Sequence, residues 1–139
     1  MSALRLLLLG PLVLLAAGCG SSGPATHPVK GQVQLAGGDA ALLAGHSLEV
    51  ALASDSTVRA YGEIQEDGTF SLETLHAGEI KSGALAGTYV ARIVLSDDDP
   101  QRARQVAAAI DPHVLDFKAS GLSIQVPAAE VVTLPIKRR

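Results

Sequence analysis

The chain of 139 residues contains a single cysteine, Cys19, no tryptophan, and only 3% aromatic residues. One thiol cannot form an intrachain disulfide, so packing alone has to stabilise the fold. The 11 basic and 14 acidic residues give a formal net charge of −3. Because nucleic-acid binding relies on excess positive charge and on aromatic stacking, we expect no nucleic-acid partner.

Long hydrophobic runs are also missing, apart from one short apolar segment near the start. Residues 6–17 are apolar except for Gly10 and Pro11, and they follow a short stretch that carries the positive charge of Arg5. A membrane-spanning helix needs about 18–20 apolar residues, and Pro11 would break such a helix in its middle. The segment is typical of a secretory signal, so the sequence predicts export and not a transmembrane helix.

The signal ends in Leu15-Ala16-Ala17-Gly18-Cys19. This segment resembles the lipobox of bacterial lipoproteins, in which a lipid is attached to the cysteine thiol and the preceding peptide bond is cleaved. It departs from the usual pattern because Ala16 stands where leucine is common. The resemblance implies that residues 1–18 are removed and that Cys19 carries the lipid. The alternative is an ordinary cleaved signal that releases the protein into the periplasm.

Cys19 could also be a small buried core residue, but the residues that follow it argue against this interpretation. Residues 20–24 are Gly, Ser and Pro, which offer no apolar surface to cover a thiol. We therefore expect residues 19–28 to form a flexible tether and residues 29–139 to form one domain. We expect a lipid-anchored protein of the bacterial cell envelope. In some bacteria an aspartate after the cysteine retains a lipoprotein at the inner membrane, and Gly20 at this position favours the outer membrane.

Hydrophobic residues after the tether alternate with period two, which is typical of strands. Residues 100–110 are the exception, because Pro100 suits the start of a helix that Asp98 or Asp99 could cap. The pattern predicts an all-β fold, an antiparallel seven-stranded β-sandwich. The expected strands are residues 29–35, 47–52, 58–64, 70–74, 88–96, 122–126 and 131–136.

Four short motifs occur in order along the domain. They are V-x-G-x-V at Val29, Gly31 and Val33, D-G-x-F-x-L at Asp67, Gly68, Phe70 and Leu72, G-x-Y at Gly87 and Tyr89, and S-G-L-x-x-x-V at Ser120, Gly121, Leu122 and Val126. With these motifs the domain resembles carboxypeptidase regulatory-like domains, and the last motif is similar to the end of short bacterial lipoproteins, notably those of planctomycetes. Pro112-His113-Val114 departs from those lipoproteins, which often have a basic residue and tyrosine after the proline. The resemblance implies a transthyretin-like or immunoglobulin-like sandwich without catalytic residues, used as an accessory or binding module.

The same motifs have plain structural interpretations. Asp67-Gly68 supplies the positive φ of a tight hairpin turn. Phe70 and Tyr89 add bulk to a core otherwise made of small aliphatic side chains, and the Tyr89 hydroxyl could bond to backbone as in a tyrosine corner. We expect Gly87 and Gly121 to act as structural residues as well.

Possible catalytic and metal-binding motifs in the chain are only weakly supported. Gly45-His46-Ser47-Leu48-Glu49 is one residue short of the G-x-S-x-G nucleophile elbow, and Ser47 opens a strand, so an esterase is a remote alternative. The four histidines (His27, His46, His76 and His113) have no zinc-ligand spacing and are expected to be solvated loop residues.

Acidic and basic clusters also have ordinary explanations. Asp97-Asp98-Asp99 lacks the glycine of a calcium loop and is expected to cap the helix. Glu63, Glu66, Asp67 and Glu73 could gather across a surface hairpin. Residues 137–139, Lys-Arg-Arg, are expected to fray in water, although they could also attract anionic headgroups.

The sequence therefore predicts a non-enzymatic lipoprotein of the cell envelope that acts as a small binding or accessory module. The expected partners are a membrane, through the lipid anchor, and an envelope protein or glycan. No cofactor or metal is expected. A purely structural envelope component is the alternative, with an esterase that uses Ser47 as a remote one.

Overall fold

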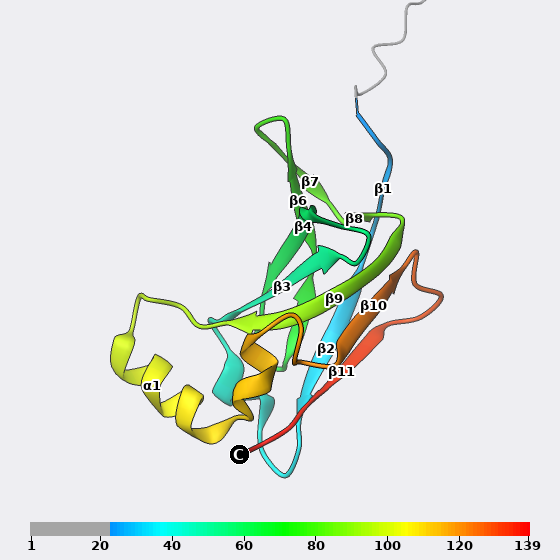
Figure 1. Cartoon of the computed structure of the whole chain (residues 1–139). Coiled ribbons are helices and arrows are strands. Elements are labelled where there is room, and N and C mark those ends of the chain that lie inside the picture. The colour runs from blue at the N-terminus through cyan, green and yellow to red at the C-terminus, as the bar shows by residue number, and fades with distance from the viewer. Residues whose placement is uncertain (1–22) are drawn as a thin grey trace, which may run out of the picture.

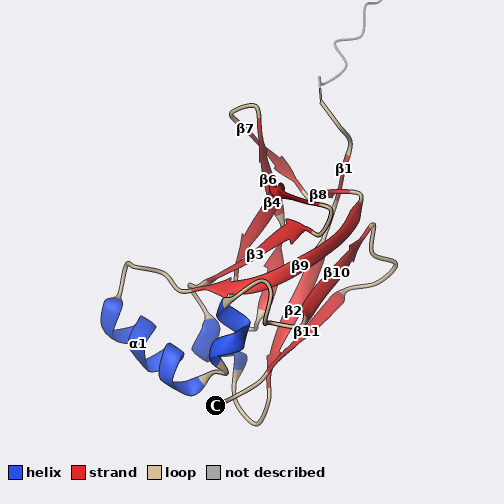
Figure 2. Cartoon of the chain, in the orientation of Figure 1, coloured by secondary structure: helices blue, strands red, loops and turns tan. Residues whose placement is uncertain are grey.

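The computed structural model describes residues 23–139, so the expected signal and Cys19 lie outside the described residues. The described chain is an all-β sandwich (Figures 1 and 2), as the alternating pattern predicts. One layer is a six-stranded antiparallel sheet and the other is a three-stranded sheet. A two-stranded ribbon lies at one end of the sandwich.

The strands of the larger sheet, in spatial order, are β10 (Leu122–Val126), β9 (Gly87–Val94), β3 (Ser47–Leu52), β4 (Asp55–Glu63), β6 (Glu73–His76) and β7 (Glu79–Ser82). The smaller sheet contains β11 (Val132–Ile136), β2 (Lys30–Leu35) and β5 (Thr69–Ser71). The ribbon pairs β1 (Thr26–His27) with β8 (Ala84–Leu85).

The core forms between the inner faces of the two sheets. Alternate residues point inward along each strand, and those of β3, β9 and β10 in the larger sheet and of β2 and β11 in the smaller one are buried. Phe70 and Tyr89 are both buried among these aliphatic side chains, as expected. The Tyr89 hydroxyl donates a hydrogen bond to the Leu85 carbonyl at 3.0 Å, which confirms the predicted bond to backbone.

The helix also forms where it was predicted. Helix α1 spans Pro100–Ala109, and the Asp99 carboxylate caps it by accepting a hydrogen bond from the Arg102 N–H at 3.0 Å. The Asp97-Asp98-Asp99 turn thus supplies the cap. Val106 is buried and attaches the helix to the sandwich, at the end remote from β1 (Figure 1). Two short 3₁₀ helices, η1 (Ala40–Leu43) and η2 (Pro112–Leu115), complete the fold.

Three features differ from the sequence expectation. Each of the seven expected strands has a counterpart, but the fourth, residues 70–74, is divided between β5 and β6, and β1, β7 and β8 are additional. The pairing is not wholly antiparallel, because β11 runs parallel to β2. Alternation identifies the buried face of a strand but not its direction, so the sequence could not distinguish the two pairings.

The expected tether is also shorter than predicted. Thr26 and His27 pair with Leu85 and Ala84, so the last part of the segment 19–28 belongs to the domain. This pairing holds the beginning of the described chain against one end of the sandwich. Within residues 23–139, none of the helices has the length and apolar character that crossing a membrane would take.

Candidate binding groove

A tight turn between β4 and β5 lies beside a hollow in the surface of the sandwich. The Gln65 N–H bonds to the Thr69 carbonyl at 2.9 Å, and Gly68 has φ +83°, which confirms the predicted turn. The Asp67 carboxylate accepts hydrogen bonds from the Thr69 hydroxyl at 2.6 Å and the Thr69 N–H at 3.0 Å. These bonds lower the pKa of Asp67 and fix the turn.

Beyond this turn the chain crosses from one sheet to the other. β5 belongs to the three-stranded sheet, whereas β6, two residues later, pairs with β4 in the six-stranded sheet. Gly62 of β4 lies so close to the crossing that a Cβ there would collide with the Ser71 carbonyl. Residues of both sheets line a hollow beside this crossing.

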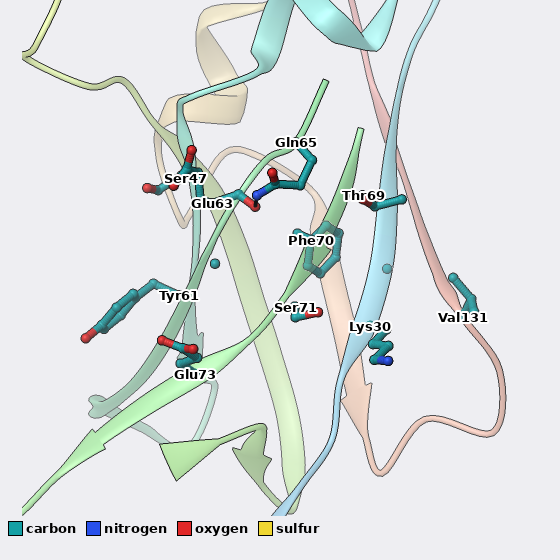
Figure 3. Close-up of a pocket in the computed structure, with 12 residues that line it drawn as sticks. Lys30, Ser47, Tyr61, Glu63, Gln65, Thr69, Phe70, Ser71, Glu73 and Val131 are labelled. Atoms are coloured by element: carbon teal, nitrogen blue, oxygen red, sulfur yellow. Dashed lines mark hydrogen bonds between the residues drawn. The ribbon is translucent and has the colours of Figure 1, made fainter. Parts of the chain in front are cut away.

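We call this hollow the edge groove, and it has a volume of about 840 Å³ (Figure 3). The Phe70 ring lies between the two layers, over Gly31, where any side chain would collide with the ring. The Tyr61 ring is 40% exposed at the rim. The groove is lined by Lys30, Gly31, Ser47, Tyr61, Gly62, Glu63, Gln65, Thr69, Phe70, Ser71, Glu73 and Val131.

The lining combines an exposed aromatic ring with many polar groups. Glu63 and Glu73 contribute carboxylates, Lys30 contributes an ammonium, and three hydroxyl side chains and one amide add donors and acceptors. A volume of this size is within the range of small-ligand pockets. The exposed lining is more apolar than polar, so the groove is suited to a ligand or a partner segment that has an apolar face and polar groups at its edges. Of the four acidic residues singled out in the sequence, it brings together Glu63 and Glu73.

The structure places Ser47 at the first position of β3, on the wall of this groove. The neighbouring His46 is buried, and its Nδ1 accepts a hydrogen bond from the Ser96 N–H at 3.0 Å. That bond occupies Nδ1, whereas the other ring nitrogen, Nε2, is buried without a hydrogen-bond partner among the described residues. The nucleophile elbow needs a strand, a turn and then a helix, whereas Ser47 is followed by strand.

The prediction that all four histidines are solvated loop residues is wrong for His46, which is only 2% exposed. The sequence offered no sign of this, because His46 stands between a glycine turn and the first strand residue. The prediction is also wrong for His27 and His76, which are half-buried in strands β1 and β6. His113 is exposed and bonds to the Asp111 carboxylate at 2.9 Å. Within the described residues, no three His, Cys, Asp or Glu side chains cluster as metal ligands would.

His46 gives a pH prediction. Burial lowers the pKa of His46, and the positive charge of Arg102 adds to the shift. The unfolded chain therefore takes up a proton at higher pH than the folded chain does. We expect the stability contributed by neutral His46 to be complete above about pH 6.5 and to fall as the pH drops below it.

Chemical denaturation between pH 7.5 and 5.5 measures this effect. In the variant His46→Asn the free energy of unfolding should depend less on pH in this range, because asparagine can accept the Ser96 hydrogen bond without titrating. An equally steep decline in the variant would contradict the assignment.

A charged cluster lies on the outer face of the larger sheet, and none of its residues was predicted as part of a site. The Glu49 carboxylate bonds to Arg59 at 2.8 Å and to Arg92 at 2.8 Å, and both guanidinium groups lie over the Phe117 ring. Burial alone would raise the pKa of Glu49, but the hydrogen bonds from Arg92 and Arg59 outweigh it and hold the pKa below its usual range. The cluster attaches the Phe117 turn to the sheet.

The basic C-terminus differs from its expectation as well. Arg138 donates a hydrogen bond to the Gly37 carbonyl at 2.9 Å, and the Arg139 N–H bonds to the Ala109 carbonyl at 3.1 Å. Residues 137–139 are thus attached to the domain and do not fray. The sequence could not show this, because the partners are backbone carbonyls of distant segments, the turn at Gly37 and the end of α1.

Comparison with known proteins adds no assignment: no protein family, curated protein or solved structure matches this chain.

Proposed function

We propose that the protein is a lipid-anchored, non-enzymatic module of the bacterial cell envelope, which binds a ligand or a partner segment through the edge groove. Cys19 carries the lipid, and residues 1–18 are the signal that is removed. The family resemblance to carboxypeptidase regulatory-like domains is consistent with such an accessory role. The ligand classes that suit the groove are an envelope glycan and a segment of an envelope protein.

The observation that carries the proposal is the position of Cys19 between the apolar run and the folded domain. The thiol follows the apolar run and stands four residues before Gly23, where the described chain begins. β1 starts at Thr26, seven residues after the cysteine, and is paired to β8. Four residues span at most about 14 Å, which would hold the sandwich at the membrane surface.

The free energy of burying acyl chains in a bilayer is large enough to hold the domain at a membrane. Each buried methylene of an acyl chain contributes about 0.8 kcal/mol, and two or more chains give stable membrane binding. The bacterial lipidation that the lipobox resemblance implies attaches more than one chain to the cysteine. Cys19 would therefore anchor the domain without a membrane-spanning segment.

The edge groove is the part of the described surface that supports a binding role. Tyr61 offers an exposed aromatic face, on which a sugar ring or an apolar side chain can stack. The carboxylates of Glu63 and Glu73 can accept hydrogen bonds from hydroxyl or amide donors. Crosslinking in whole cells from a photoreactive residue at position 61 would separate a glycan from a protein partner.

The variant Cys19→Ala tests the anchor in the protein's own membrane. We expect the wild-type protein to fractionate with membranes and to incorporate an acyl label, and the variant to lose the label and to accumulate unprocessed. The matched control Ser21→Ala changes a residue of similar size two positions later and should behave as wild type. If Cys19→Ala were processed and membrane-bound like the wild type, the anchor would be excluded.

A further inference from the structure

The β6–β7 hairpin carries an exposed apolar pair that no other part of the described chain covers. Leu75 and Ile80 face each other across the hairpin, and their side chains are 56% and 64% exposed. The tip turns at Ala77 and Gly78, with φ of +50° and +79°. Cross-strand partners share one face of a sheet, so the two side chains form a continuous apolar surface.

This hairpin lies at the end of the sandwich where the described chain begins. Figure 1 shows it projecting at the same end of the sandwich as β1. A Cβ built on Gly23 would lie 2.7 Å from the Lys81 Nζ and 3.3 Å from the His76 ring. The beginning of the chain therefore lies against the hairpin, on the face opposite to Leu75 and Ile80.

We propose that the β6–β7 hairpin is a second membrane contact, through which Leu75 and Ile80 dip into the headgroup region of the bilayer that holds Cys19. This inference rests on the proposed anchor and specifies how the anchored domain is oriented. Gly23 touches the hairpin and follows Cys19 by four residues, at most about 14 Å of chain. A lipid on Cys19 would keep the apolar pair within reach of the bilayer.

The charges of the hairpin limit the contact to the surface of the bilayer. Glu79 is exposed next to the tip, where a carboxylate would resist transfer into hydrocarbon. Leu75 and Ile80 can still occupy the boundary between headgroups and acyl chains, as the apolar faces of peripheral proteins do. In this orientation α1 points away from the membrane, and the edge groove remains accessible from the side.

Tryptophan fluorescence tests the orientation, because the chain has no native tryptophan. The mature lipidated protein would carry either Leu75→Trp on the hairpin or the control Gln101→Trp on α1, both at exposed positions. Each variant would be reconstituted into vesicles of phospholipid brominated near the headgroup. Flotation reports membrane binding, and circular dichroism reports the fold.

We expect Trp fluorescence from position 75 to be quenched by about half or more, and fluorescence from position 101 to be unchanged. Adding Ile80→Ser to Leu75→Trp should weaken the quenching while the protein still floats with the vesicles. Vesicle-bound protein with no quenching at position 75, or with equal quenching at both positions, would overturn the hairpin contact and leave the anchor intact. Protein that fails to float would overturn the anchor and the hairpin contact together.

Discussion

Phe70→Ala is expected to lower the free energy of unfolding by about 3–5 kcal/mol, the usual cost of removing a buried phenylalanine. Phe70 is 3% exposed and lies over Gly31, between the two sheets at the floor of the edge groove. The gap cannot close easily, because β2 and β5 are held in register by backbone pairing on both sides of the ring. The loss is a large part of the 5–15 kcal/mol that typically stabilises a domain.

Urea or thermal unfolding of the domain measures this loss. Tyr61→Ala is the matched control, because it removes an aromatic ring of similar size from the rim of the same groove, where 40% of Tyr61 is exposed. It should cost about 1 kcal/mol or less, as surface substitutions usually do. Equal losses in the two variants would mean that Phe70 is not a core residue.

Gly83→Ala is expected to lower the free energy of unfolding by about 2–4 kcal/mol, because it combines a strained backbone with a steric collision. Gly83 has φ +88°, and a Cβ there would collide with the carbonyl group of His27 in β1. The glycine cannot shift to relieve the collision, because its N–H bonds to the Leu72 carbonyl at 2.7 Å and its carbonyl accepts from the Thr74 hydroxyl at 2.7 Å. The substitution should therefore also detach β1 from β8.

Gly78→Ala separates the two contributions. Gly78 has a similar φ of +79°, but nothing lies within 4 Å of a Cβ at that position. It should cost about 1–2 kcal/mol, the cost of the left-handed conformation alone. Hydrogen exchange should show lost protection at residues 26, 27, 84 and 85 only in Gly83→Ala. Equal stabilities and equal exchange in the two variants would contradict the role of Gly83.

Much of the fold could be predicted from the sequence because its strands are amphipathic. The alternation of Leu48 and Val50 with polar residues marks β3, and Pro100 after three aspartates marks α1. β7 was missed because Ile80 is exposed and stands among polar residues, so no buried face marks it. β1 was missed because two residues are too short to show a period.

The candidate site was less predictable, since it depends on contacts between distant segments. The sequence suggested that Glu63, Glu66, Asp67 and Glu73 could gather across the hairpin, but the groove that contains Glu63 and Glu73 is lined by residues of both sheets. The partners of Glu49 lie 10 and 43 residues along the chain. No local pattern indicates such pairs. Small residues with a structural role, such as Gly62 and Gly83, can be identified only once their neighbours are known.

The central claim is that Cys19 carries a lipid and is the first residue of the mature protein. Mass spectrometry of the protein extracted from its own membranes tests it most directly. If Cys19 is lipidated, we expect an N-terminal peptide that begins at Cys19 and has the added mass of acyl chains, followed by unmodified residues 20–139. An unmodified Cys19, or a mature chain that begins at another residue, would contradict the account.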